Sequence, residues 1–247
     1  MFASFALDTQ RISEIQQLDT EVLGPICPAD ISCGYAYIDN DVCVSTVAVI
    51  GQYIRKLQET DSTPEAVLSA ALCHDCRSND LDLLMRSALD RAGFPNVRII
   101  ALIDDDLSIA IKEPAITPNS GRPEERPLRI GVFGPIPVIV TEEFNRTVVE
   151  RLKANGLEVV LPPIAQLLGQ RDVFEPALQF FAGEGITYAI GVIPFGCMSG
   201  HVFARGRLRT FQRLYPDLQI TLIDYDPSAS DINTVNRTEL VIQSILE

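Results

Sequence analysis

The chain has 247 residues, and its apolar fraction of 47% excludes an intrinsically disordered protein. Its 33 acidic and 20 basic residues give a net charge of −13, which argues against binding to nucleic acid or to an anionic membrane. No apolar run is long enough to span a membrane, and no basic segment followed by an apolar core opens the chain. We therefore expect a cytoplasmic protein without a signal peptide.

Residues 1–112 predict an N-terminal α/β lobe. Their apolar pattern predicts a helix over 44–59, a strand over 66–72, a helix over 80–92 and a strand over 97–103. Strands that are apolar throughout and alternate with helices are typical of a parallel sheet with both faces covered.

A proline-rich segment over 113–127 predicts a linker between two lobes. Prolines stand at positions 114, 118, 123 and 127. Because proline fixes φ and lacks an amide donor, we expect neither a helix nor a central strand in this segment.

Residues 128–247 predict a C-terminal α/β lobe with a clearer alternation. Predicted strands cover 129–133, 158–161, 188–193 and 220–224, and predicted helices cover 142–154, 173–182, 201–214 and 231–245. Four βα units in a row predict a doubly wound sheet of the flavodoxin or Rossmann kind. The expected fold class is therefore α/β, with two lobes that each carry a doubly wound, mostly parallel sheet.

Three of the six cysteines occupy the same kind of position. Cys43, Cys76 and Cys197 each lie between a short apolar run and a predicted helix. Strand ends and helix starts gather along one edge of an α/β sheet, where ligands bind. Three thiols brought together there, between the two lobes, would hold an iron–sulfur cluster with one iron site open. Taken singly, each of these cysteines fits a buried core residue equally well.

The remaining cysteines leave other sites open. Cys73 forms a Cys-x-x-Cys pair with Cys76, a spacing that suits metal chelation or a redox dithiol. Cys27 and Cys33 are six residues apart and form no second pair of this kind. A reducing cytosol argues against a disulfide framework, and we expect Cys27 and Cys33 to stand outside the site.

The two histidines, His74 and His201, each lie within four residues of one of the three cysteines. A structural zinc site is therefore an alternative to a cluster, because four thiolate and imidazole ligands suit closed, tetrahedral zinc. Its ligands would be Cys73, Cys76, Cys197 and His201. The chain has no phosphate-binding loop, dinucleotide fingerprint or nucleophile elbow of the familiar kinds.

Four stretches, in chain order, carry a family resemblance. They are Tyr-Ile-Asp-Asn-Asp-Val-Cys at 37–43, Cys-Arg at 76–77 with Ala-Leu-Asp-Arg-Ala-Gly-Phe-Pro-Asn-Val at 88–97, Arg-Ile-Gly-Val-Phe-Gly at 129–134, and Phe-Gly-Cys-Met at 195–198 with Ile-Asp-Tyr-Asp-Pro-Ser-Ala-Ser at 223–230. They are similar to segments of the 2-hydroxyacyl-CoA dehydratase superfamily. The resemblance is closest to the dehydratase-like C-terminal portion of the large CoA-substrate-specific enzyme activase proteins.

The resemblance implies a [4Fe–4S] cluster held by Cys43, Cys76 and Cys197. It implies a lyase that carries out radical dehydration or reduction of an acyl-CoA-type substrate in an anaerobic setting. The implied partners are an ATP-dependent activator that donates one electron and a second dehydratase-like subunit.

The chain departs from the family next to two of the cysteines. Val44-Ser45 replaces the proline that usually follows the first cysteine, and Cys73-His74-Asp75 replaces a glycine-rich approach to the second. Cys73 is therefore a candidate fourth ligand that would close the cluster. A closed cluster leaves open a non-enzymatic alternative, an electron-transfer or cluster-scaffold protein.

Overall fold

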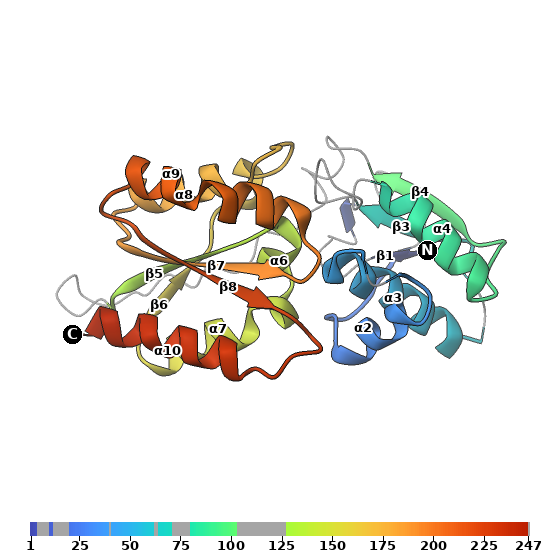
Figure 1. The fold of residues 1–247 in the computed structure, drawn as a ribbon. Helices are drawn as coiled ribbons and strands as arrows, with labels where there is room; N and C mark the ends of the chain where they lie inside the picture. The colour runs from blue at the N-terminus through green and yellow to red at the C-terminus, as the bar shows by residue number, and fades with distance from the viewer. Residues whose placement is uncertain are drawn as a thin grey trace. The chain divides into compact units, whose positions relative to one another are not determined.

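The computed structural model describes residues 1–3, 10–11, 20–39, 41–61, 64–70, 80–102 and 127–246. The chain divides into two compact units, Met1–Lys112 and Glu113–Glu247. The described residues form two four-stranded parallel sheets with helices between the strands (Figure 1), so the predicted α/β class is confirmed. The linker predicted over 113–127 lies outside the described residues except for Pro127.

The sheet of the first unit has the strand order β2-β1-β3-β4, with every neighbouring pair parallel. Its strands are β1 (Phe2–Ala3), β2 (Glu21–Val22), β3 (Ala66–Ala70) and β4 (Arg98–Leu102). Val67 and Phe2 belong to one buried cluster, whereas Leu68 and Ala3 belong to another. Because successive side chains point to opposite faces of a strand, both faces of this sheet are buried, as in parallel α/β proteins.

The described helices of the first unit are α2 (Pro28–Tyr35), α3 (Val44–Glu59) and α4 (Leu81–Arg91). Helix α3 has the bounds that its sequence pattern predicts, and its apolar side chains recur every three or four residues toward the core. The Tyr53 hydroxyl donates to the Leu68 carbonyl oxygen at 2.7 Å, which fastens α3 to β3.

Helix α4 ends at a Schellman motif. Gly93 has φ +91°, the Phe94 amide donates to the Leu89 carbonyl oxygen at 2.8 Å, and the Gly93 amide donates to the Asp90 carbonyl oxygen at 3.2 Å. Glycine suits this left-handed position because it has no Cβ. The turn directs the chain into β4, close to the predicted start of that strand.

The sheet of the second unit has the order β6-β5-β7-β8, again entirely parallel. Its strands are β5 (Arg129–Phe133), β6 (Glu158–Val160), β7 (Tyr188–Pro194) and β8 (Gln219–Tyr225). Each lies within one residue of the predicted bounds. Strands β7 and β8 pair over their full length, from Tyr188 opposite Gln219 to Pro194 opposite Tyr225.

Helices cover both faces of this second sheet. Figure 1 shows α8 and α9 over one face and α7 and α10 over the other, the arrangement of a doubly wound fold. The helical segments are α6 (Ile136–Val140), α7 (Glu142–Ala154), η3 (Ile164–Gln166), α8 (Phe174–Gly183), η4 (Gly200–Arg205), α9 (Gly206–Leu214) and α10 (Ile232–Leu246). None of the helices in the described ranges is both long enough and apolar enough to traverse a lipid bilayer.

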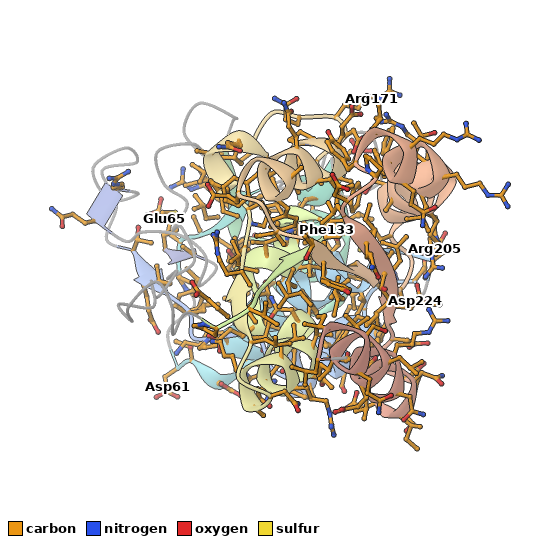
Figure 2. The ribbon with its side chains drawn as sticks, turned by 90° about the vertical axis from the view of Figure 1, so that its left-hand side faces the viewer. Asp61, Glu65, Phe133, Arg171, Arg205 and Asp224 are labelled. Atoms are coloured by element: carbon orange, nitrogen blue, oxygen red, sulfur yellow. The ribbon has the colours of Figure 1, made fainter. Side chains whose placement is uncertain are left out.

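The core beneath α8 is aromatic. Phe133, at the end of β5, meets Phe174 and Phe181 edge-on, with ring centroids 6.3 and 6.1 Å apart. Phe133, labelled in Figure 2, is fully buried. Such edge-to-face pairs add to the free energy of apolar burial and hold α8 against the sheet.

Candidate functional site

In each unit the first and third strands lie side by side in the sheet. The second strand lies on the outer side of the first, and the fourth strand lies on the outer side of the third. In the second unit these strands are β5, which leads to β6 on one side, and β7, which leads to β8 on the other. Ligands of open α/β sheets bind outside the carboxyl ends of the strands at such a switch point. The carboxyl ends of β5 and β7 are therefore the expected binding edge of this unit.

Cys197 lies at this edge, three residues beyond the end of β7. The turn that brings it there contains Gly196 with φ +73°, and the Cys197 amide donates to the Pro194 carbonyl oxygen at 3.0 Å. Glycine suits this left-handed position, so the tight turn from strand to helix depends on it.

The Cys197 side chain is 3% exposed and sits among hydrogen-bonding groups. Its Sγ atom lies 3.4 Å from Ser199 Oγ and accepts a hydrogen bond from the Gly200 amide at 3.3 Å. A Cβ on Gly200 would stand 2.6 Å from Ile193 Cγ2 and 3.2 Å from the same sulfur. A glycine at position 200 thus lets the backbone approach the thiol closely.

A π-helical segment begins three residues after Cys197. Segment η4 covers Gly200–Arg205 and continues into α9, so the helix predicted from residue 201 exists but opens with a wider turn. Arg205 forms an ion pair with Asp224 near the end of β8, and Figure 2 shows these two side chains together. π-Helical turns are rare and frequently occur at functional sites.

Cys43 occupies the N-cap of α3 in the first unit, as its sequence position predicts. Its side chain is 8% exposed, and Sγ lies 3.1 Å from Ser45 Oγ. Its carbonyl oxygen accepts the amides of Thr46 and Val47 at 2.9 and 3.1 Å. Because α3 packs along β3 and leads back to the start of that strand, Cys43 stands at the carboxyl edge of its own sheet.

The two buried cysteines share a local arrangement that sequence reasoning missed. Each is followed two residues later by a serine, in Cys43-Val-Ser45 and Cys197-Met-Ser199, and both serines are buried. In both cases the serine hydroxyl turns back onto the cysteine sulfur. The repeated Cys-x-Ser pattern is visible in the sequence, but the thiol–hydroxyl contact follows only from the backbone geometry of the two helix starts.

Three apolar side chains surround the turn at Cys197 and face outward. Phe195, Met198 and Val202 are each about half exposed, at 48%, 52% and 54%. Met198 and Val202 are four residues apart on one helical stretch, so they lie on the same side of it. Exposed apolar residues grouped beside a binding edge are typical of a surface that contacts a ligand or partner.

Of the other candidate residues, three lie outside the described residues and His201 is exposed. Cys73, His74 and Cys76 fall within 71–79, which the structure leaves undescribed. His201 lies in η4 with its side chain exposed. Among the described residues there is no group of three or more histidine, cysteine, aspartate or glutamate side chains that could hold a metal ion.

Cys27 and Cys33 belong to the region of α2. Cys27 is the N-cap of that helix, and its sulfur lies 3.8 Å from Arg55 Nη2. Burial raises the pKa of the Cys33 thiol, and the nearby Asp30 carboxylate raises it further. Both effects disfavour the thiolate, which is the form that binds metals.

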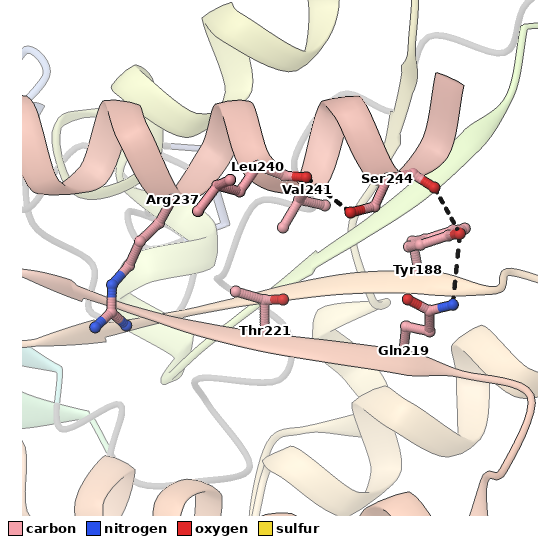
Figure 3. Close-up of a pocket in the computed structure, with 7 residues that line it drawn as sticks. All are labelled: Tyr188, Gln219, Thr221, Arg237, Leu240, Val241 and Ser244. Atoms are coloured by element: carbon pink, nitrogen blue, oxygen red, sulfur yellow. Dashed lines mark hydrogen bonds between the residues drawn. The ribbon is translucent and has the colours of Figure 1, made fainter. Parts of the chain in front are cut away.

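A surface pocket of about 270 Å³ lies at the opposite end of the second sheet (Figure 3). Its lining residues are Tyr188, Gln219, Thr221, Arg237, Leu240, Val241 and Ser244. The Tyr188 hydroxyl donates to the Ser244 carbonyl oxygen at 3.0 Å, and Arg237 donates to the Leu222 carbonyl oxygen at 3.0 Å. Since Tyr188 and Gln219 begin their strands, this pocket lies away from the edge that holds Cys197.

The fold and the edge residues together define an α/β protein with two parallel sheets and a buried thiol at the carboxyl edge of each. The chain matches no protein-family model, and no curated protein matches it at a significant level. The similarity of the four stretches to the dehydratase superfamily therefore stays a prediction.

Proposed function

We propose that this chain binds a [4Fe–4S] cluster through Cys43, Cys76 and Cys197 and acts as a dehydratase-like subunit on an acyl-CoA-type substrate. One observation carries the proposal. Cys43 and Cys197 are each buried at the carboxyl edge of the parallel sheet of their own unit, at or next to the start of a helix, with a serine hydroxyl against the sulfur. A sheet edge of this kind is where α/β proteins bind ligands.

The chemistry of the donor set suits a cluster. Thiolates are soft ligands that select iron–sulfur clusters and zinc, and three of them leave one iron coordination site open. The positive end of a helix dipole stabilises the deprotonated form of a nearby thiol. Cys43 at the N-cap of α3 is placed to benefit from this effect.

The position of Cys76 in the chain supports its role as the third ligand. It follows β3, the third strand of the first unit, as Cys197 follows β7, the third strand of the second unit. Both sheets have the same strand order, so both cysteines come after the strand that borders the switch point. The proposed site draws its ligands from both units.

When bound, such a cluster supplies one electron and an open iron site for the substrate. The residues of this chain would contact the substrate. The side chains of Phe195, Met198 and Val202 provide an apolar surface beside Cys197, suited to the acyl part of a thioester. The proposed partners are an ATP-dependent activator, which delivers the electron, and a second dehydratase-like subunit.

One observation favours a second candidate function, that of a non-enzymatic electron carrier or cluster scaffold. Cys73 lies three residues after the described end of β3, the same offset that separates Cys197 from the end of β7. If Cys73 is a ligand as well as Cys76, four thiolates close the cluster and no iron site remains for a substrate.

Anaerobic purification, iron and sulfide analysis, and absorption and electron paramagnetic resonance spectra test the proposal. We expect about four irons and four sulfides per chain, and loss of the cluster in each of Cys43→Ala, Cys76→Ala and Cys197→Ala. Cys27→Ala is the matched control and should keep the cluster. Retention of the cluster in all three ligand variants, or a colourless protein with one zinc per chain, contradicts the proposal.

The variant Cys73→Ala separates the two candidate functions. If the cluster is open, Cys73→Ala leaves its spectrum unchanged, and an added acyl-CoA perturbs the spectrum of the wild-type cluster. If the cluster is closed, the variant changes the spectrum and acyl-CoA leaves the wild-type spectrum unchanged.

A further inference from the structure

The pocket of Figure 3 lies within the second unit, between α10 and β8, the strand at one edge of the described sheet. Its lining residues come from β7, β8 and α10, so the first unit contributes nothing to it. Its volume of about 270 Å³ is slightly below the range of about 300–1,000 Å³ that is typical of pockets for drug-sized ligands. A molecule smaller than a drug would fill it.

The charge of the pocket is positive. Arg237 is the charged residue among those that line it, and none of the lining residues is acidic. The chain as a whole has 33 acidic and 20 basic residues, so a site with a guanidinium and without a carboxylate differs from the average surface. Such a site attracts small anions.

The Arg237 guanidinium is held in place and still has donors to spare. Its Nη1 atom donates to the Leu222 carbonyl oxygen at 3.0 Å, and Figure 3 shows its side chain descending from α10 to β8. A guanidinium has five N–H donors. Within the described residues no carboxylate pairs with Arg237, since Glu239 pairs with Arg151 and Asp224 pairs with Arg205.

Thr221 adds a second unpaired donor. Figure 3 shows its side chain between β8 and α10, and among the described residues its hydroxyl has no hydrogen-bond partner. At the other end of the pocket the Tyr188 hydroxyl donates to the Ser244 carbonyl oxygen and accepts from Gln219 Nε2 at 3.5 Å. The groups at that end are therefore paired with one another, and the guanidinium and the Thr221 hydroxyl are left for a ligand.

The wall of the pocket on α10 is apolar. Leu240 and Val241 line it, and Leu240 is 62% exposed, so a bound hydrocarbon chain would cover apolar surface that now faces water. One guanidinium neutralises one negative charge, and its planar fork matches a carboxylate with two parallel hydrogen bonds. These features together favour a single carboxylate with a short apolar chain over a multiply charged phosphate ester.

We propose that this pocket binds a small organic monocarboxylate. The carboxylate lies on Arg237 and the Thr221 hydroxyl, and the hydrocarbon chain lies against Leu240 and Val241. This binding needs neither the proposed cluster nor the first unit, because all of its residues belong to Glu113–Glu247.

A titration of the full chain with hexanoate, followed by ¹⁵N-resolved amide chemical shifts, tests the proposal. We expect saturable shifts at Thr221 and over residues 237–244, with a Kd on the order of 1 mM for so small a ligand. Hexanamide has nearly the same shape without the charge, and inorganic phosphate has charge without the chain. Each should bind at least about tenfold more weakly.

Two variants of exposed leucines on α10 test the role of the charge without removing Arg237. Leu240→Glu places a carboxylate three residues after Arg237, where it competes for the guanidinium, and should weaken hexanoate binding by at least about tenfold. Leu246→Glu is the matched control, since this residue is 58% exposed on the same helix and does not line the pocket. Its Kd should stay within about twofold of the wild type.

Two further variants act on the donors themselves. Thr221→Val removes a hydroxyl that has no partner among the described residues, so it should keep the fold and weaken binding by about threefold. Arg237→Gln should abolish saturation, and circular dichroism shows whether it also loses structure with its hydrogen bond to the Leu222 carbonyl oxygen.

Three results would overturn the proposal. The first is hexanoate binding that is absent, or that shifts amides away from the pocket. The second is hexanamide or inorganic phosphate binding as tightly as hexanoate, since neither combines the charge with the chain. The third is the same Kd for Leu240→Glu and Leu246→Glu, because the carboxylate would then not be bound by Arg237.

Discussion

The two units have the same strand order, but their described strands differ in length. Their strand orders, β2-β1-β3-β4 and β6-β5-β7-β8, are equivalent when each unit is counted from its first strand. Within the described residues, β1 and β2 have two residues each against five and three in β5 and β6, and β3 and β4 have five each against seven in β7 and β8. A parallel ladder with few hydrogen bonds contributes little by itself. Among the described residues, the first unit therefore has the shorter ladder beside a close helix pair, α2 and α3, and the second unit has the longer ladder.

The two units are sensitive to an added side chain at different places. In the first unit, α2 and α3 approach so closely that two glycines are needed at their contact, Gly34 and Gly51. In the second unit, Gly200 lies beside the candidate ligand Cys197, where an added Cβ would crowd the cysteine sulfur. Glycine thus serves helix packing in one unit and thiol placement in the other.

The largest effect is expected from Gly51→Ala. A Cβ at this position would overlap the Asp30 carbonyl oxygen and lie 2.5 Å from the Gly34 amide nitrogen, both of which are backbone atoms of α2. Since backbone atoms cannot turn aside, we expect a loss of about 3 kcal/mol of unfolding free energy. Urea unfolding followed by circular dichroism measures it.

Gly183→Ala is the matched control in the second unit. An added Cβ at this position in α8 meets no atom within 4 Å, so the variant should be neutral or slightly more stable. Equal stabilities for Gly51→Ala and the wild type would show that the α2–α3 contact does not control the first unit.

A smaller effect is expected from Gly200→Ala. The new Cβ would press on Ile193 Cγ2 at 2.6 Å and on Cys197 Sγ at 3.2 Å, so we expect a loss of about 1–2 kcal/mol and a lower iron content after reconstitution. Gly206→Ala is the control, because its Cβ would make only an ordinary contact, 3.6 Å from the His201 carbonyl oxygen. Unchanged iron content in Gly200→Ala would refute a close coupling between this glycine and the thiol.

The smallest effect concerns the thiol of Cys33. Burial, followed by the Asp30 carboxylate, raises its pKa, so its thiolate forms at higher pH in the folded than in the unfolded protein. Alkylation of Cys33 by iodoacetamide, followed by mass spectrometry at several pH values, should therefore reach half of its maximal rate at a higher pH in buffer than in urea. The same midpoint in both solvents would contradict this assignment.

The raised pKa of Cys33 also predicts how the unfolding free energy depends on pH. A thiol whose pKa is raised by folding keeps its proton longer in the folded state, so it binds more protons than the unfolded state between the two pKa values. Its contribution to the unfolding free energy is fully present below the unfolded pKa and is lost as the pH rises through the folded pKa.

Much of the fold could be predicted from local patterns. The helix over 44–59 and the strand over 129–133 have the predicted bounds. The helix has a long apolar periodicity, and the strand is a short apolar run. Strands β1 and β2 were not predicted, since two-residue strands exist only through pairing with neighbours. Helices α2 and α6 were missed as well. They are short, and each carries a proline in its first turn, Pro28 or Pro137, a position where helices accept proline.

The candidate site was predictable only as separate pieces. The positions of Cys43 and Cys197 at the starts of helical segments follow from the order of apolar runs and helix patterns, and the structure has them there. Neither the contact of each sulfur with a serine nor the π-helical segment after Cys197 could be read from periodicity. The sulfur–serine contacts depend on backbone torsions at the two helix starts. The π-helical segment also takes part in a contact between distant residues, the ion pair between Arg205 and Asp224.

The sequence by itself determined most of the longer helices and strands, because periodic burial and turn residues act over a few neighbouring positions. It also determined that Cys43 and Cys197 stand at the starts of helical segments. Only the tertiary structure decided the strand order of each sheet, the burial of the two thiols and their contacts with Ser45 and Ser199. The strand order and the burial of the thiols depend on backbone pairing and on packing between residues that are distant in the chain. The thiol–hydroxyl contacts join residues two positions apart, but their geometry depends on backbone torsions that periodicity does not specify.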